Sequence, residues 1–88
     1  MKTDEICDRY YAKNVGLSIR LLYEQEGEAS TTVLVEGVAE ALRMLAELLV
    51  TVADESENEG FSISPFGAGR AHFSLASTLG IYIRRIDK

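Results

Sequence analysis

Residues of the types that carry out chemistry are scarce in this 88-residue chain, which has one histidine, His72, and one cysteine, Cys7. Nucleophilic catalysis needs a serine or cysteine held beside a base. The sequence contains none of the motifs Gly-x-Ser-x-Gly, Cys-x-x-Cys and His-x-x-x-His. A structural zinc site needs more ligands than one cysteine and one histidine supply. We therefore expect no enzymatic activity, no catalytic residue, no metal and no cofactor.

The surroundings of these two residues also argue against reactivity. Glu5 and Asp8 lie close to Cys7 and disfavour its thiolate, and His72 is expected in a surface loop. The sequence Gly-Ala-Gly-Arg at 67–70 lacks the Gly-Lys-Ser/Thr ending of a phosphate loop, so it predicts a glycine turn. A single cysteine also excludes the internal disulfide framework of small secreted proteins.

Acidic residues are concentrated in the middle of the chain. Residues 24–69 contain ten of the 14 acidic residues and one basic residue, Arg43, whereas the whole chain has a formal charge of −5. A field of this sign repels phosphate backbones and raises the encounter rate with basic proteins. We therefore predict a protein partner and no nucleic-acid binding. The alternative is that the acids only keep a small protein in solution.

Length and composition limit the architecture. The chain has the length of one domain, and 47% hydrophobic with 26% charged residues is ordinary globular usage. Its longest apolar stretch, residues 38–53, is interrupted by Glu40, Arg43 and Glu47, whereas a membrane span needs about 20 nearly uncharged residues. We expect a single cytoplasmic domain over residues 1–88, without membrane contact and with a loosely ordered lead-in at 1–14.

Period-two patterns predict four strands. Apolar residues alternate with others along residues 16–24, as in a half-buried strand, and residues 31–36 are rich in β-branched side chains. The polar residues 24–30 between them predict a turn, and so an antiparallel hairpin. Two further strands are predicted at residues 60–65 and 79–86.

Between the two strand pairs, the period of the apolar residues changes from two to 3.6 after Gly37. The apolar residues then recur at i, i+3, i+4 and i+7, and Glu40, Arg43 and Glu47 take the opposite face. This pattern predicts one amphipathic helix from Val38 to Ala53. A helix that starts earlier, at residue 30, is the weaker alternative because Gly37 would cost about 1 kcal/mol inside it.

The order β-β-α-β-β predicts the α+β class: a two-layer sandwich with one amphipathic helix packed on a four-stranded, largely antiparallel sheet. Leu22, Tyr23 and Tyr82 are candidates for the sheet face that the helix leaves uncovered. The connection at residues 66–78 is long for a compact domain, so it is either a binding loop or a packed segment that seals the sheet edge. The predicted inward residues are Leu17, Ile19, Leu21, Val33, Val35, Leu42, Leu45, Leu49, Phe61, Ile63, Ile81 and Ile83.

One segment is similar to a known group of proteins. In residues 32–49, an apolar strand ends in Glu36-Gly37 and runs into a helix that contains Leu-Ala-Glu-Leu-Leu at 45–49. This segment, and in style the tail at 77–83 with the last strand, resembles small immunity proteins of bacterial polymorphic-toxin systems, over about half of the chain. The resemblance implies a non-enzymatic protein-binding module that neutralises a toxin, and it carries over no catalytic residues.

Many toxin domains are basic nucleases, so an acidic inhibitor would meet them by electrostatic steering. The acids predicted to bind the toxin's lysines and arginines are Glu40, Glu47, Asp54, Glu55, Glu57 and Glu59. The aromatic residues predicted to supply a buried anchor are Phe66, Phe73 and Tyr82. One alternative is a homo-oligomeric accessory protein, such as a homodimer paired through the open sheet face or an edge strand. The other is a small-molecule enzyme, which no constellation supports.

Overall fold

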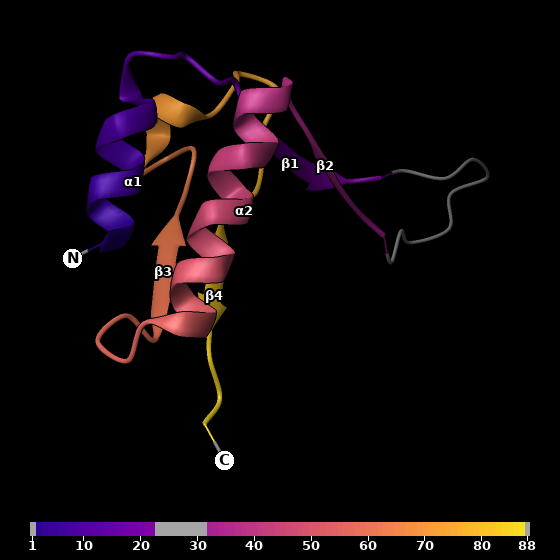
Figure 1. Ribbon diagram of the computed structural model, residues 1–88. Helices are drawn as coiled ribbons and strands as arrows, with labels where there is room; N and C mark the ends of the chain where they lie inside the picture. Colours follow the sequence, from indigo (N-terminus) through magenta and orange to yellow (C-terminus); the bar gives the residue numbers. More distant parts are fainter. Residues whose placement is uncertain (1, 23–31, 88) are drawn as a thin grey trace.

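Figure 1 shows the computed structural model of the chain, which describes residues 2–22 and 32–87. The predicted turn at residues 24–30, and Tyr23 with it, lie outside the described residues. The helices are α1 (Lys2–Tyr11), α2 (Ala39–Asp54) and the short 3-10 helix η2 (Arg70–His72). The strands are β1 (Ser18–Leu21), β2 (Val33–Glu36), β3 (Gly60–Ile63) and β4 (Ile81–Arg84).

The chain belongs to the α+β class, and the four predicted strands and the amphipathic helix are confirmed. Strand β1 pairs with β2 and strand β3 pairs with β4, both antiparallel. Ile19 lies opposite Val35 in the first pair, and Phe61 lies opposite Ile83 in the second. The predicted single four-stranded sheet is wrong, because the described strands form two separate two-stranded sheets.

The segment that leads from η2 into β4 runs along the free side of β1 and explains why the sheets stay separate. The backbone N–H of Leu17 donates to the carbonyl of His72 at 2.7 Å, and the carbonyl of Ile19 accepts from the N–H of Leu79 at 2.9 Å. Between these two contacts, the Ser77 hydroxyl accepts from the Ile19 N–H at 2.9 Å and donates to the Ile19 carbonyl at 3.1 Å. A side chain thus takes the place of a strand neighbour, and the backbone ladder of a continuous sheet is interrupted.

Residues 1–14, predicted to be a loosely ordered lead-in, instead contain helix α1. Thr3, Ile6 and Tyr10 are buried on one side of this helix, which packs against α2 (Figure 1). An isolated helix of 10 residues is marginal in water, so α1 depends on this packing. Its apolar pattern is carried by only two large residues, Ile6 and Tyr10, which is too short a signal to predict a helix from sequence.

Helix α2 turns a different face to the core than its spacing predicted. Met44 and Leu48 are fully buried, whereas Leu42 and Leu49, predicted to point inward, are 47% and 42% exposed. Leu45 is partly buried against the core. The cause is α1: it packs on one side of α2 and draws the buried face toward itself, which leaves the predicted leucines on the other side.

The core lies between helices α1 and α2 and the two sheets. The predicted inward residues of the strands divide into buried Leu17, Ile19, Phe61 and Ile63, partly buried Ile81 and Ile83, and exposed Leu21, Val33 and Val35. The exposed group lies on the part of the first hairpin that projects beyond the helices (Figure 1). We call the β1–β2 hairpin the arm. Among the described helices, none is long and apolar enough to cross a lipid bilayer.

Candidate functional site

Three of the six acids predicted to bind a partner, Glu40, Glu47 and Glu55, instead pair with cations of the same chain. Glu40 accepts hydrogen bonds from Lys13 at 3.0 Å and from Arg43 at 2.6 Å, and these donors hold the pKa of its carboxyl below the usual value. Glu47 accepts from Tyr10 and Arg9, and the Tyr10 hydroxyl is the largest cause of its lowered pKa. Both acids therefore connect α2 to α1 and its C-terminal end, a role that could not be predicted without α1.

The loop after α2 is held by three contacts. Asn58 is buried, and its side-chain amide donates to the Thr3 hydroxyl at 3.2 Å and accepts from the Thr3 N–H at 3.3 Å. The Glu55 carboxylate pairs with Lys2 at 2.5 Å. The Arg85 guanidinium donates to the carbonyls of Val52 and Glu55 at 2.7 and 2.9 Å, so it satisfies carbonyls at the C-terminal end of α2. The loop is fixed in position by these bonds.

Three of the predicted acids remain exposed at this end of the molecule: Asp54, Glu57 and Glu59, which we call the acidic end. Their carboxylates form no ion pair with any residue in the described ranges 2–22 and 32–87. The backbone of Glu59 is bound, since its carbonyl accepts from the Arg85 N–H at 2.7 Å. The acidic end therefore presents charge on a fixed backbone, which lowers the entropy cost of binding a cationic partner.

Tyr82 joins two of these acids. A surface hollow of about 300 Å³ is lined by Glu57, Glu59, Gly60, Phe61, Ser62 and Tyr82. Tyr82 lies opposite Ser62 in the β3–β4 pair and is 70% exposed, as predicted. Gly60 is required here, because a Cβ at this position would lie 2.9 Å from the carbonyl oxygen of Ile83. The hollow combines two unpaired carboxylates with an aromatic ring, which is suited to a lysine or arginine side chain.

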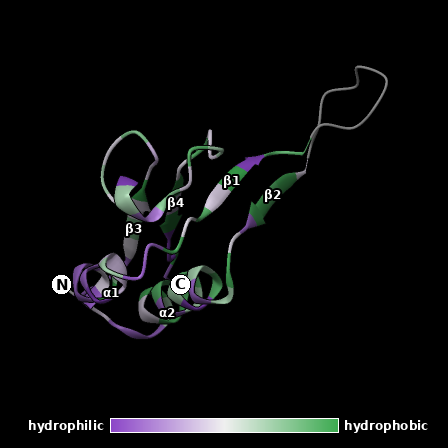
Figure 2. Ribbon diagram, turned by 90° about the horizontal axis from the view of Figure 1, so that it is seen from above, coloured by the Kyte–Doolittle hydropathy of each residue, from purple (hydrophilic) through white to green (hydrophobic). Residues whose placement is uncertain are grey.

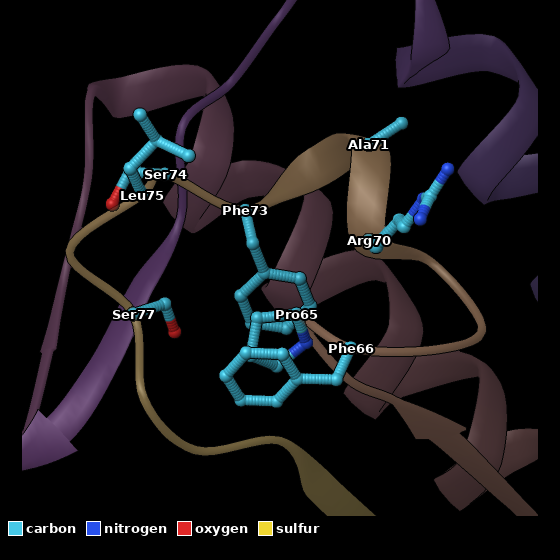
Figure 3. A pocket seen from close by; sticks show the side chains of 8 residues that line it. All are labelled: Pro65, Phe66, Arg70, Ala71, Phe73, Ser74, Leu75 and Ser77. Atoms are coloured by element: carbon cyan, nitrogen blue, oxygen red, sulfur yellow. The ribbon is translucent and has the colours of Figure 1, made fainter.

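The other two predicted anchors lie elsewhere. Phe66 is 80% exposed, and Phe73 is partly buried against the core. They share a separate hollow of about 360 Å³ with Arg70 and Leu75 (Figure 3). The structure therefore brings Tyr82 together with the acids and places Phe66 and Phe73 in a second hollow of their own.

His72 is not in an exposed loop as predicted but is buried, with 3% exposure. Burial lowers the pKa of its imidazole, and its Nδ1 atom has no hydrogen-bond partner among residues 2–22 and 32–87. The ring of Tyr11 packs edge to face against the imidazole, with 6.3 Å between the ring centroids. Burial is also the main cause of the raised pKa of the Cys7 thiol, with further contributions from Asp4 and Asp8. Both side chains are therefore uncharged at neutral pH. No cluster of three His, Cys, Asp or Glu with metal-binding geometry occurs in the described part of the chain.

A second surface was not predicted at all. On α2, Leu42 and Leu49 are exposed, and exposed apolar residues of the arm precede them in the chain on the other side of Gly37. Figure 2 shows the hydrophobic colouring along β2 and the direction in which the arm leaves the helices. We call this surface the apolar face. It consists of Leu21, Val33, Val35, Val38, Leu42 and Leu49, each between 38% and 61% exposed.

The sequence did contain a signal for this surface. The apolar arc of α2 includes positions 38, 42, 45, 46, 49 and 53 as well as the buried ones, which is wider than a helix needs to cover one layer. So wide an arc indicates that apolar residues lie beyond the side of α2 that packs on the core.

Comparison with known proteins gives no match: no family model, no curated protein and no solved structure is significantly similar to this chain. The function is therefore argued from the geometry of the two surfaces.

Proposed function

We propose that this chain is a protein-binding module without enzymatic activity, and that it binds a basic protein through the acidic end. The observation that carries the proposal is the hollow in which Glu57, Glu59 and Tyr82 lie together. Two carboxylates that pair with no cation among the described residues attract a lysine or arginine, and an exposed tyrosine supplies an apolar wall and a cation–π surface.

The fixed backbone of the loop supports the same conclusion. A binding loop that is already ordered loses little entropy when its partner arrives, and here Asn58 and Arg85 order the loop before any partner is present. The four acids within residues 54–59 also concentrate negative potential at one end of the molecule. Such a potential raises the rate at which a basic partner associates.

The more specific proposal is that the partner is a basic toxin domain and that the chain is its immunity protein. The resemblance of residues 32–49 to immunity proteins motivates this choice, and the position of Glu57 and Glu59 beside Tyr82 is compatible with it. In this proposal, the side chains that bind the toxin are those of Asp54, Glu57, Glu59 and Tyr82. Glu40 and Glu47 hold α1 and do not contact the toxin.

The proposal is tested by tagging the full chain in its native host and identifying the proteins that co-purify at low and at high salt. We expect a basic protein that is retained at low salt and lost at high salt, because salt screens exposed charges. The E57Q/E59Q variant should lose this protein. The control variant E5Q/D8N removes the same charge at exposed positions of α1 outside the hollow and should retain it. Equal loss from both variants, or a partner that resists salt, contradicts the proposal.

A further inference from the structure

We infer that a second copy of this chain docks on the arm, with β2 paired antiparallel to β2 around a two-fold axis at Leu34. This surface is separate from the acidic end, so the inference does not depend on the proposed toxin partner.

The first observation is a free backbone edge. Leu22 donates to the carbonyl of Thr32 at 2.8 Å, and in an antiparallel pair the hydrogen-bonded residue pairs alternate with non-bonded ones. Leu22 and Thr32 therefore form a hydrogen-bonded pair, Leu21 and Val33 a non-bonded pair, and Arg20 and Leu34 the next bonded pair. The N–H and C=O groups of Leu34 accordingly point toward β1. Those of Val33 and Val35 therefore point away from it, toward the open side of β2.

No described segment covers this edge. Strand β2 has β1 as its single neighbour, and it contains neither proline nor lysine nor a bulge. Natural proteins use such features to protect an exposed edge from pairing with another chain. The edge of β2 carries none of these three features and has two outward donor–acceptor pairs, so it can accept a further strand.

The second observation is that this edge is complementary to itself. If two copies of β2 meet antiparallel with Leu34 opposite Leu34, then Val33 of each copy lies opposite Val35 of the other. The backbone groups of Val33 and Val35 point outward. In this register, Val33 of each copy therefore exchanges two backbone hydrogen bonds with Val35 of the other copy. The same register places Glu36 opposite Thr32, and no two like charges face each other. Glu36 is in any case paired with Arg20 of its own copy at 3.0 Å.

The third observation is the apolar face beside the edge. Val33 and Val35 share one side of the arm with Leu21 and Ile19, and a β2–β2 pair joins the two apolar faces into one surface. The six residues of one apolar face are each between 38% and 61% exposed, and apolar patches of a few hundred Å² on a monomer often mark interaction sites. A stable interface buries about 800 Å² of accessible surface on each partner. The backbone of β2 and the polar residues around the apolar face would add to the area that the apolar face buries.

Charge favours a second copy over a strongly charged partner at this surface. On the described residues of the arm, Arg20 and Glu36 neutralise each other, and the adjoining flank of α2 is uncharged from 38 to 53. On these described residues, a strongly charged protein finds no net charge that attracts it. The acidic end lies at the other end of α2 (Figure 1), and Glu24, Glu26 and Glu28 lie outside the described residues.

The inference is tested by measuring the mass of the full chain in solution by sedimentation over a range of concentrations. We expect the wild type to be a dimer and the V35K variant to be a monomer, because a lysine on the edge strand blocks pairing. The control V50K makes the same substitution on the exposed side of α2 outside the apolar face and should remain a dimer. A monomeric wild type, or equal dissociation of both variants, overturns the inference. Circular dichroism and the melting temperature establish that V35K is folded.

A second measurement tests the register itself. Leu34 and its copy form a non-bonded pair across the axis, with Cα atoms about 4.5 Å apart, which falls within the range of a disulfide. In a background without Cys7 (C7S), the L34C variant should form a disulfide-linked dimer under mild oxidation. Its rate should exceed that of V50C by at least about tenfold, since pairing raises the effective thiol concentration. Equal rates for the two variants contradict β2–β2 pairing.

Discussion

The two ends of this molecule are built by different means. At the acidic end, the backbone is fixed by side-chain hydrogen bonds from Asn58, Lys2 and Arg85, and the exposed groups are carboxylates. At the arm, the backbone is held by the β1–β2 ladder and by the hydrogen bonds of Ile19 to Ser77 and Leu79, and the exposed groups are valines and leucines. One end therefore offers charge on a preordered loop, and the other offers an uncovered strand edge with an apolar side.

A comparison of the acids shows that the cations near an acid, more than its type or its exposure, decide whether it is available to bind a partner. Glu40, Glu47 and Glu55 each face a cation from the N-terminal part of the chain, at Lys13, Arg9 and Lys2. Asp54, Glu57 and Glu59 face none within the described residues. Half of the predicted acidic site thus stabilises the fold, and the other half stays accessible.

The largest expected effect is on the free energy of unfolding, and it distinguishes the side of α2 that packs in the core from the side that belongs to the apolar face. Met44 is fully buried and Leu42 is 47% exposed. M44A should lower the free energy of unfolding by about 2–5 kcal/mol, because it leaves a cavity. L42A should lower it by less than about 1 kcal/mol in dilute protein, as expected for a half-exposed side chain. Urea denaturation of the two variants checks this, and similar losses would mean that the leucine side of α2 is core.

The next effect concerns the acidic end. N58A leaves the hydroxyl and the N–H of Thr3 without their partner, and a buried unsatisfied group costs about 1–3 kcal/mol. The matched control S56A changes an exposed residue of the same loop and should stay within about 0.5 kcal/mol. Hydrogen exchange should accelerate at residues 55–59 in N58A while the arm is unaffected. If exchange also accelerates at the arm, the two ends are not independent.

A smaller effect is expected from pH. Burial holds the pKa of His72 below its ordinary value of 6.5, so the unfolded chain binds a proton that the folded chain does not. Stability should therefore be complete above about pH 6.5 and should fall as the pH drops below that value. The pKa values of Glu40 and Glu47 are lowered by their hydrogen-bond donors, so their contribution is lost only below the ordinary value of 4.5. Thermal melts of wild type and H72Q between pH 7.5 and 5 check this, and a decline of equal slope in H72Q would contradict it.

The sequence predicted the strands and the helix whose apolar residues recur with a clear period. It did not predict helix α1, which depends on its packing against the rest of the fold. The alternation in 16–24 and the 3.6 spacing from Val38 were sufficient for the strands and for α2. Helix α1 was missed because two large apolar residues make a weak pattern, and every error about α2 followed from that. Without α1 there was no reason to turn Met44 inward, to pair Glu47 or to bury His72.

The candidate site was predictable only in composition. The acids at 54–59 and Tyr82 were identified as residue types that bind basic partners, but 23 residues separate Glu59 from Tyr82 along the chain. It is the β3–β4 pairing that brings them to one hollow. The apolar face could not be predicted as exposed, because the period of an amphipathic helix specifies an apolar side and not what covers it.

The most direct test of the central claim, that the two ends bind different partners, is capture of the salt-sensitive basic protein by V35K and by E57Q/E59Q in parallel. The account predicts that V35K, although monomeric, retains the basic protein at low salt, and that E57Q/E59Q loses it while remaining a dimer. If V35K loses the basic protein, or if E57Q/E59Q retains it, then the acidic end is not the binding site for that partner and the claim is contradicted.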